Sequence, residues 1–155
     1  MAALQRLVSE RMGRALRSGL AYFLAVFAAG FALGVLRTLY VAPHVGVLAA
    51  VAIELPVILA VAWWVSARLQ RGSSPTPRDA GLMGGTAFVL LMLAEASLAI
   101  ALFGRTIAEH LSLYADADHR LGLAGQIAFA LIPAVQAHYR RRDGSPRRRG
   151  RSGSG

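Results

Sequence analysis

The sequence predicts an all-α fold, a four-helix transmembrane bundle made of two helical hairpins. Of its 155 residues, 55% are hydrophobic, and four long apolar stretches stand out. Each comes close to the roughly 20 helical residues that cross a hydrocarbon core, and none alternates polar with apolar residues as barrel strands do. We expect the four-span domain to cover 19–138, with spans at about 19–41, 45–67, 81–103 and 121–137.

Residues 1–18 form a basic segment before the first span. Arginines and apolar residues follow one another there at near-helical spacing, as in an amphipathic helix that lies on a membrane surface. A frayed basic leader is the alternative. The first span lacks a small-residue cleavage site, so we expect it to be retained as a helix.

A packing motif and a charge share one face of the first span. Gly30 and Gly34 have the GxxxG spacing that lets another backbone approach closely. Arg37 continues the same face at helical spacing. The sequence therefore predicts that the Arg37 side chain points into the bundle and that this glycine face packs against another helix.

The second span follows a tight turn marked by Pro43 and Gly46. It carries Glu54 and Pro56, and because proline has no amide hydrogen we expect a kink beside the carboxylate. A polar linker over 71–78 then joins the two hairpins.

The third and fourth spans each carry one prominent polar residue, Glu95 and Gln126. Between these spans, residues 104–120 form a polar connection. Residues 139–155 are predicted to be a disordered, arginine-rich cytoplasmic tail.

The arginines predict the orientation of the chain. All but three of its 17 basic residues lie on one side of the spans, and cytoplasmic loops carry the excess of positive charge. Both termini are therefore expected in the cytoplasm, with the lipid bilayer as the main partner. A basic patch can also bind nucleic acid. Here the charge follows the membrane topology, so no nucleic-acid partner is expected.

The ionisable groups inside the spans are the candidate site. Hydrocarbon excludes such groups unless they are paired or useful. Glu54 and Glu95 lie at about the same depth, counted from the neighbouring turns at about 1.5 Å per residue. We expect an ion pair between Arg37 and Glu54, with Glu95 and Gln126 completing a polar cluster. One arginine facing two carboxylates leaves surplus negative charge, so one carboxyl group is expected to hold a proton.

This cluster has a structural and a functional interpretation. Polar contacts and small residues hold membrane helices together where water-driven burial cannot. Intramembrane ionisable groups also mark ion and substrate pathways. The sequence leaves both interpretations open.

Metal and cofactor chemistry is not indicated. The chain has no cysteine, which excludes disulfides, thiolate metal sites and thiol catalysis. Histidines and acids in the connection over 104–120 are residue types that bind zinc, but their spacing matches no metal motif. Solvated loop residues are the better interpretation. No metal site and no cofactor are predicted, and no catalytic triad or phosphate-binding loop is found.

Several residues carry a resemblance to known families. The block over 30–37, followed by Pro43, Gly46 and the Glu54-Leu55-Pro56 element, resembles an uncharacterised family of small bacterial four-helix integral membrane proteins. That resemblance implies a bacterial inner (plasma) membrane location and supplies no activity. The chain is more distantly similar to the membrane-associated eicosanoid and glutathione metabolism family, which has four short helices and a Glu-x-Pro element. Its glutamate lacks the following asparagine of that family.

Three functions follow as hypotheses. The first is a non-enzymatic structural or accessory membrane component, acting as a homo-oligomer or with another membrane protein. The second is a small proton-linked transporter or channel that uses Glu54 and Glu95. The third, which rests on the distant resemblance, is a membrane enzyme with its active site between the first and second spans.

Overall fold

The protein is almost entirely helical. The computed structural model describes residues 1–72, 75–104, 106 and 116–143. Its elements are α1 (Ala2–Leu36), the short π-helix η1 (Arg37–Val41), α2 (Ala42–Val45), α3 (Val47–Leu69), α4 (Pro77–Phe103) and α6 (Ala117–Asp143). No strand occurs in the part of the chain that the structure describes. The predicted all-α four-helix architecture is confirmed.

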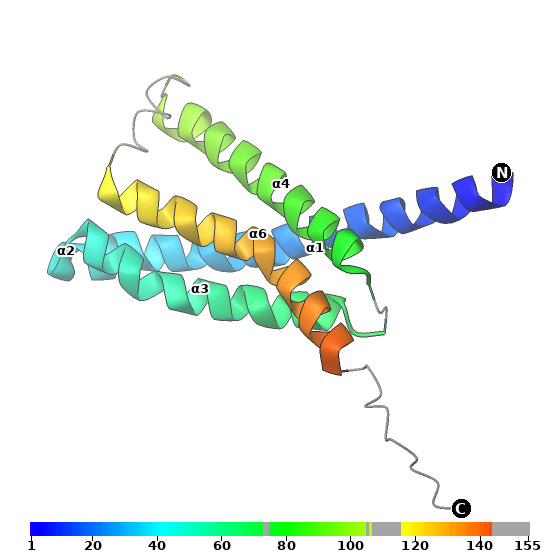
Figure 1. The fold of residues 1–155 in the computed structure, drawn as a ribbon. Coiled ribbons are helices and arrows are strands. Elements are labelled where there is room, and N and C mark those ends of the chain that lie inside the picture. Colours follow the sequence, from blue (N-terminus) through cyan, green and yellow to red (C-terminus); the bar gives the residue numbers. More distant parts are fainter. Residues whose placement is uncertain (73–74, 105, 107–115, 144–155) are drawn as a thin grey trace, which may run out of the picture.

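The four long helices pack as a ring. Helix α1 contacts α3 and α4, and α6 contacts the same two helices, so α1 and α6 lie across one diagonal and α3 and α4 across the other. Figure 1 shows that the start of α1, the end of α3, the start of α4 and the end of α6 lie toward one end of the molecule. We call this the terminal end. Helix α2 lies at the opposite end, which we call the α2 end.

Helix α1 is longer than the predicted first span. It runs without a break from Ala2 to Leu36, so most of the basic segment 1–18 belongs to the same helix as the first span. At about 1.5 Å per residue, its 35 residues extend for about 52 Å, against a hydrocarbon core of about 30 Å. The N-terminal part of α1 accordingly runs on beyond the other helices (Figure 1).

Glycines and a capping box set the helix ends. Gly46 separates α2 from α3 with φ 83°, a left-handed conformation that favours glycine. Gly104 ends α4 with φ 62°. At the start of α4, the Thr76 hydroxyl accepts from the backbone N–H of Asp79 at 3.2 Å, and the Asp79 carboxylate accepts from the Thr76 N–H at 3.1 Å. This pattern satisfies two backbone donors that the helix would leave unpaired.

The buried core is formed by residues of all four long helices. Tyr22 and Ala87 are fully buried, and Phe129 and Met83 are nearly so. A β-carbon on Gly84 would collide with the backbone carbonyl of Ala130, so α4 and α6 touch there through their main chains.

The surface of the bundle is apolar. Four helices are long and apolar enough to cross a membrane: Gln5–Val45, Val47–Leu69, Pro77–Ala101 and Ala117–Arg142. Large apolar side chains are exposed on every one of them, among them Leu24, Ile53, Val89 and Leu131. Such a surface is stable in lipid and unstable in water. The chain is a multi-pass membrane protein.

The fourth helix extends past the predicted span at both ends, from Ala117 to Asp143. The first five residues of the predicted tail over 139–155 are therefore helical. The rest of that tail, 144–155, lies outside the described residues, as does most of the connection between α4 and α6.

Candidate functional site

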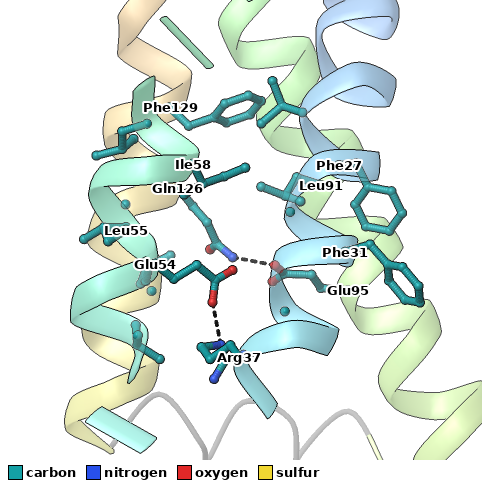
Figure 2. A pocket seen from close by; sticks show the side chains of 18 of the residues that line it. Phe27, Phe31, Arg37, Glu54, Leu55, Ile58, Leu91, Glu95, Gln126 and Phe129 are labelled. Carbon is teal, nitrogen blue, oxygen red and sulfur yellow. Dashed lines mark hydrogen bonds and ion pairs between the residues drawn. The ribbon is translucent and has the colours of Figure 1, made fainter. Parts of the chain in front are cut away.

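A cavity of about 580 Å³ lies among the four long helices. Small-molecule sites in proteins usually enclose about 300–1,000 Å³, so this one is large enough for a ligand. Its lining is mostly apolar and comes from α1, α3, α4 and α6, with polar side chains gathered toward the α2 end (Figure 2).

Arg37 and Glu54 form an ion pair at the polar end of the cavity. Arg37 Nε lies 2.5 Å from Glu54 Oε2, and the side chains are 28% and 19% exposed. Arg37 begins η1, and single π-turns inside long helices are frequent at functional sites. Glu54 lies eight residues past Gly46, about 12 Å along α3. The pair joins η1, which follows α1 directly, to α3, as Figure 2 shows.

Glu95 and Gln126 make a matching contact within the second hairpin. Gln126 Nε2 donates to Glu95 Oε1 at 2.6 Å, which joins α6 to α4. Glu95 lies nine residues before Gly104, about 13 Å along its helix, so the two carboxylates have similar depths. Both line the same cavity. The structure therefore brings all four predicted cluster residues to one cavity, as two pairs that each lie within one hairpin.

The predicted packing glycines line the cavity too. A β-carbon on Gly30 would lie 3.6 Å from Ile58 Cδ1, and one on Gly34 would meet nothing within 4 Å. These two small residues leave space at the cavity wall. Closer approach of helices occurs at other glycines, such as Gly19, whose β-carbon would lie 2.8 Å from the Met83 carbonyl oxygen.

Pro56 lies inside α3, two residues after Glu54. Its ring nitrogen cannot donate to the carbonyl of Ala52, four residues earlier. Pro56 is exposed and Leu55 beside it lines the cavity, so the proline lies on the outer side of the helix that carries Glu54.

A core closes the cavity toward the terminal end. Phe23, Val26, Ala62 and Phe129 line the cavity and also belong to the buried core cluster. The cavity reaches the surface of the chain elsewhere, because its lining residues Phe31 and Val47 are 55% and 51% exposed. Among the described residues, buried core side chains bound the cavity toward the terminal end.

Acidic and histidine side chains gather near the start of α6. His119 Nδ1 lies 3.2 Å from Asp118 Oδ2, and both residues line the cavity. With Asp116 they bring three potential ligand atoms within 4.8 Å of one another. Asp116 is exposed, and a metal site also needs supporting contacts around its ligands, so this proximity alone does not indicate a metal. His44 lies apart, with Nδ1 2.7 Å from the Tyr40 carbonyl oxygen.

A second polar cluster, which the sequence analysis missed, lies between α3 and α6. Gln70 Nε2 contacts Ser66 Oγ at 2.9 Å and the carbonyl oxygen of Pro133 at 3.2 Å. Gln136 Nε2 donates to the Trp63 carbonyl at 2.9 Å. The side chains of Ser66, Gln70 and Gln136 are buried. The i, i+4 spacing of Ser66 and Gln70 at the end of α3 was the one available signal, and we interpret this cluster as a structural lock at the terminal end.

Comparison with protein-family models, with curated proteins and with solved structures finds no match to this chain.

Proposed function

We propose that this chain is an accessory membrane component that binds a small amphiphilic molecule inside the bilayer. The observation that carries the proposal is the cavity among the four long helices. Most of its wall is apolar, and its polar side chains lie toward the α2 end. An amphiphile has matching parts, an apolar body and a polar head.

The exposed part of the lining supports entry from the lipid. Phe31 and Val47 line the cavity and are more than half exposed. A molecule dissolved in the bilayer can therefore reach the cavity without passing through water. The polar side chains of the described lining are three acids, an arginine, a histidine and an amide, and such groups can bind the polar head of an amphiphile.

Cavity filling tests the proposal. Gly34 lines the cavity, and a β-carbon there meets nothing within 4 Å, so a side chain at this position starts in open space and Gly34→Leu should reduce the cavity volume. Gly85 is a matched control, since its β-carbon also meets nothing and it is exposed on α4. We expect saturable binding of the neutral fluorescent probe 2-naphthalenemethanol to wild-type protein and Gly85→Leu in lipid nanodiscs, and about tenfold weaker binding to Gly34→Leu. Absence of saturable binding, or equal binding to all three proteins, would contradict the proposal.

We also propose a bacterial inner-membrane location with both termini in the cytoplasm. Support comes from the resemblance to small bacterial membrane proteins, from the arginine distribution and from the common end at which α1 begins and α6 ends (Figure 1). The chain has no cysteine, so single cysteines at Ser9 and His44 can report topology. A membrane-impermeant maleimide added to spheroplasts should label His44→Cys and leave Ser9→Cys unlabelled. The reverse pattern would invert the topology.

Association with a second copy or with another membrane protein stays a prediction. Crosslinking in native membranes tests it, and a strictly monomeric protein without partners would count against it.

A second candidate function is proton-linked transport that uses Glu54 and Glu95. It is favoured by the placement of both carboxylates at similar depth in one cavity. Proteoliposomes with an imposed pH gradient test it. Flux that disappears in Glu54→Gln and Glu95→Gln would support transport, and absence of any pH-driven flux would exclude it.

A further inference from the structure

We propose that the N-terminal part of α1 is a docking surface for an acidic amphipathic helix of another protein. We call this part, residues 5–14, the arm. It runs beyond the other helices at the terminal end (Figure 1). The cavity is not involved, so this surface and the cavity can be tested separately.

The first argument is a stripe of residues that runs along α1 from the bundle into the arm. The stripe consists of residues spaced alternately four and three apart: Val8, Met12, Ala15, Gly19, Tyr22 and Val26. Such spacing is that of the a and d positions through which one helix packs on another. The last four residues are buried in the bundle, whereas Val8 and Met12 are 52% and 48% exposed. The packing side of α1 therefore continues into the arm, where the described residues leave it exposed.

The second argument is the distance of the arm from the lipid. The arginines at positions 6, 11, 14 and 17 exclude this part of α1 from hydrocarbon. The apolar run of the first span begins at Gly19, and Val8 and Met12 precede it by about 16 and 10 Å of helix. A headgroup layer is only about 5–8 Å thick. Because α1 is unbroken from Ala2 to Leu36, both side chains lie beyond that layer. An apolar stripe in water favours a protein partner.

The third argument is charge. The arm carries three arginines, Arg6, Arg11 and Arg14, and one acid, Glu10. Further arginines lie at the same end of the molecule, in the last turns of α3 and α6 and the first turn of α4. Charges beside a helical seam select its partner, and like charges repel. A second copy of the arm would bring the same positive charge, so the surface fits an acidic helix and disfavours pairing with itself.

Two designed peptides test this inference on the full chain in nanodiscs of uncharged phosphatidylcholine. The acidic probe has about three heptads, with leucine at a and d and glutamate at e and g, and the basic probe has lysine in place of glutamate. We expect the acidic probe to bind with a dissociation constant on the order of 10 μM, and the basic probe to bind about tenfold or more weakly. Added salt should weaken binding of the acidic probe. Absence of binding, or equal binding of both probes, would overturn the proposal.

Variants of the arm locate the contact. Val8→Gln and Met12→Gln replace exposed apolar side chains without changing the charge, and each should weaken binding of the acidic probe about tenfold. Gly13→Gln is the matched control, since a β-carbon on Gly13 meets nothing within 4 Å and the residue points away from the stripe. It should bind like the wild type. If all three variants bound equally, the probe would be held by charge alone and the apolar stripe would not be a docking surface.

A spin label distinguishes a protein partner from the membrane surface. The chain has no cysteine, so Val8→Cys can carry the label in nanodiscs that contain anionic phosphatidylglycerol. We expect the label to collide with a water-soluble nickel complex more than with oxygen dissolved in the bilayer. The opposite preference would show that lipid covers the stripe, and the assignment to a protein partner would be wrong.

Discussion

Tyr22 donates a hydrogen bond from its hydroxyl to the backbone carbonyl of Phe129 at 3.0 Å, and the two rings stack with their centroids 4.5 Å apart. In a regular helix that carbonyl would accept from the amide of residue 133. Pro133 has no amide hydrogen, so the tyrosine hydroxyl on α1 supplies the missing donor to α6. The contact joins two helices that lie across a diagonal of the ring.

Replacing Tyr22 with phenylalanine should destabilise the bundle. The change keeps the ring stack, removes the hydroxyl and leaves the Phe129 carbonyl without this donor. We expect a loss of about 0.5–2 kcal/mol in the free energy of unfolding, the range for single hydrogen bonds in proteins and membrane bundles. Thermal unfolding of the purified protein in detergent would measure it.

The same substitution in a Pro133→Ala background provides the control. Alanine restores an amide that can donate to the Phe129 carbonyl, so the hydroxyl of Tyr22 becomes less important. Tyr22→Phe should then cost clearly less than in the wild type. An equal cost in the two backgrounds would show that the tyrosine acts through packing and not through the freed carbonyl.

Two adjacent glycines in α4 should respond in opposite ways to alanine. At Gly84 a β-carbon would collide with the backbone of Ala130, whereas at Gly85 it would meet nothing. Overpacking a close contact typically costs about 1–3 kcal/mol, and a backbone neighbour cannot move aside as a side chain can. Gly84→Ala should therefore lower the unfolding temperature markedly.

Gly85→Ala should leave stability unchanged or raise it by up to about 1 kcal/mol, because alanine favours a helix. The comparison is made by thermal unfolding of both variants under identical conditions. Similar behaviour of the two variants would mean that α4 and α6 do not touch at Gly84.

The spans could be predicted because hydropathy is a local property of the chain. Apolar runs of membrane-crossing length that lack the alternating polar and apolar residues of barrel strands fit few structures other than transmembrane helices. The continuity of α1 could not be predicted in the same way. Its arginines suggested a boundary near residue 18, but charged residues interrupt a hydropathy pattern without interrupting a helix.

Contacts between helices were harder to predict than the helices. The sequence singled out Gly30 and Gly34 by spacing, yet a β-carbon would meet backbone atoms at Gly19 and Gly84. Spacing shows which glycines share a face, and only the position of the partner helix shows where backbones meet. Ser66 and Gln70 were missed for a related reason: polar residues near a span end usually face water, and nothing local shows that α6 covers them.

Gln70 should be important for the contact between α3 and α6. Its side chain is 3% exposed and lies within hydrogen-bond distance of Ser66, Gln136 and the Pro133 carbonyl. Gln70→Leu keeps the volume and leaves buried polar partners unsatisfied, at an expected cost of about 1–2 kcal/mol. Gln5→Leu, at an exposed position of α1, is the matched control and should unfold at the wild-type temperature. A Gln70→Leu variant that matched this control would show that the cluster does not lock the helices.

Variants of the ion pair between Arg37 and Glu54 distinguish a structural role of the pair from a role in ligand binding or transport. Removing one partner of a fully buried pair costs about 3–5 kcal/mol. Because these side chains are 28% and 19% exposed, we expect about 1–3 kcal/mol for Arg37→Gln, which leaves a carboxylate facing apolar groups. The double variant Arg37→Gln/Glu54→Gln should recover most of that loss, since it leaves no unpaired charge. Thermal unfolding of the single and double variants gives the coupling between the two residues. If the single variants were as stable as the wild type, the pair would not hold the hairpin together, and its cost would have to be explained by ligand binding or transport.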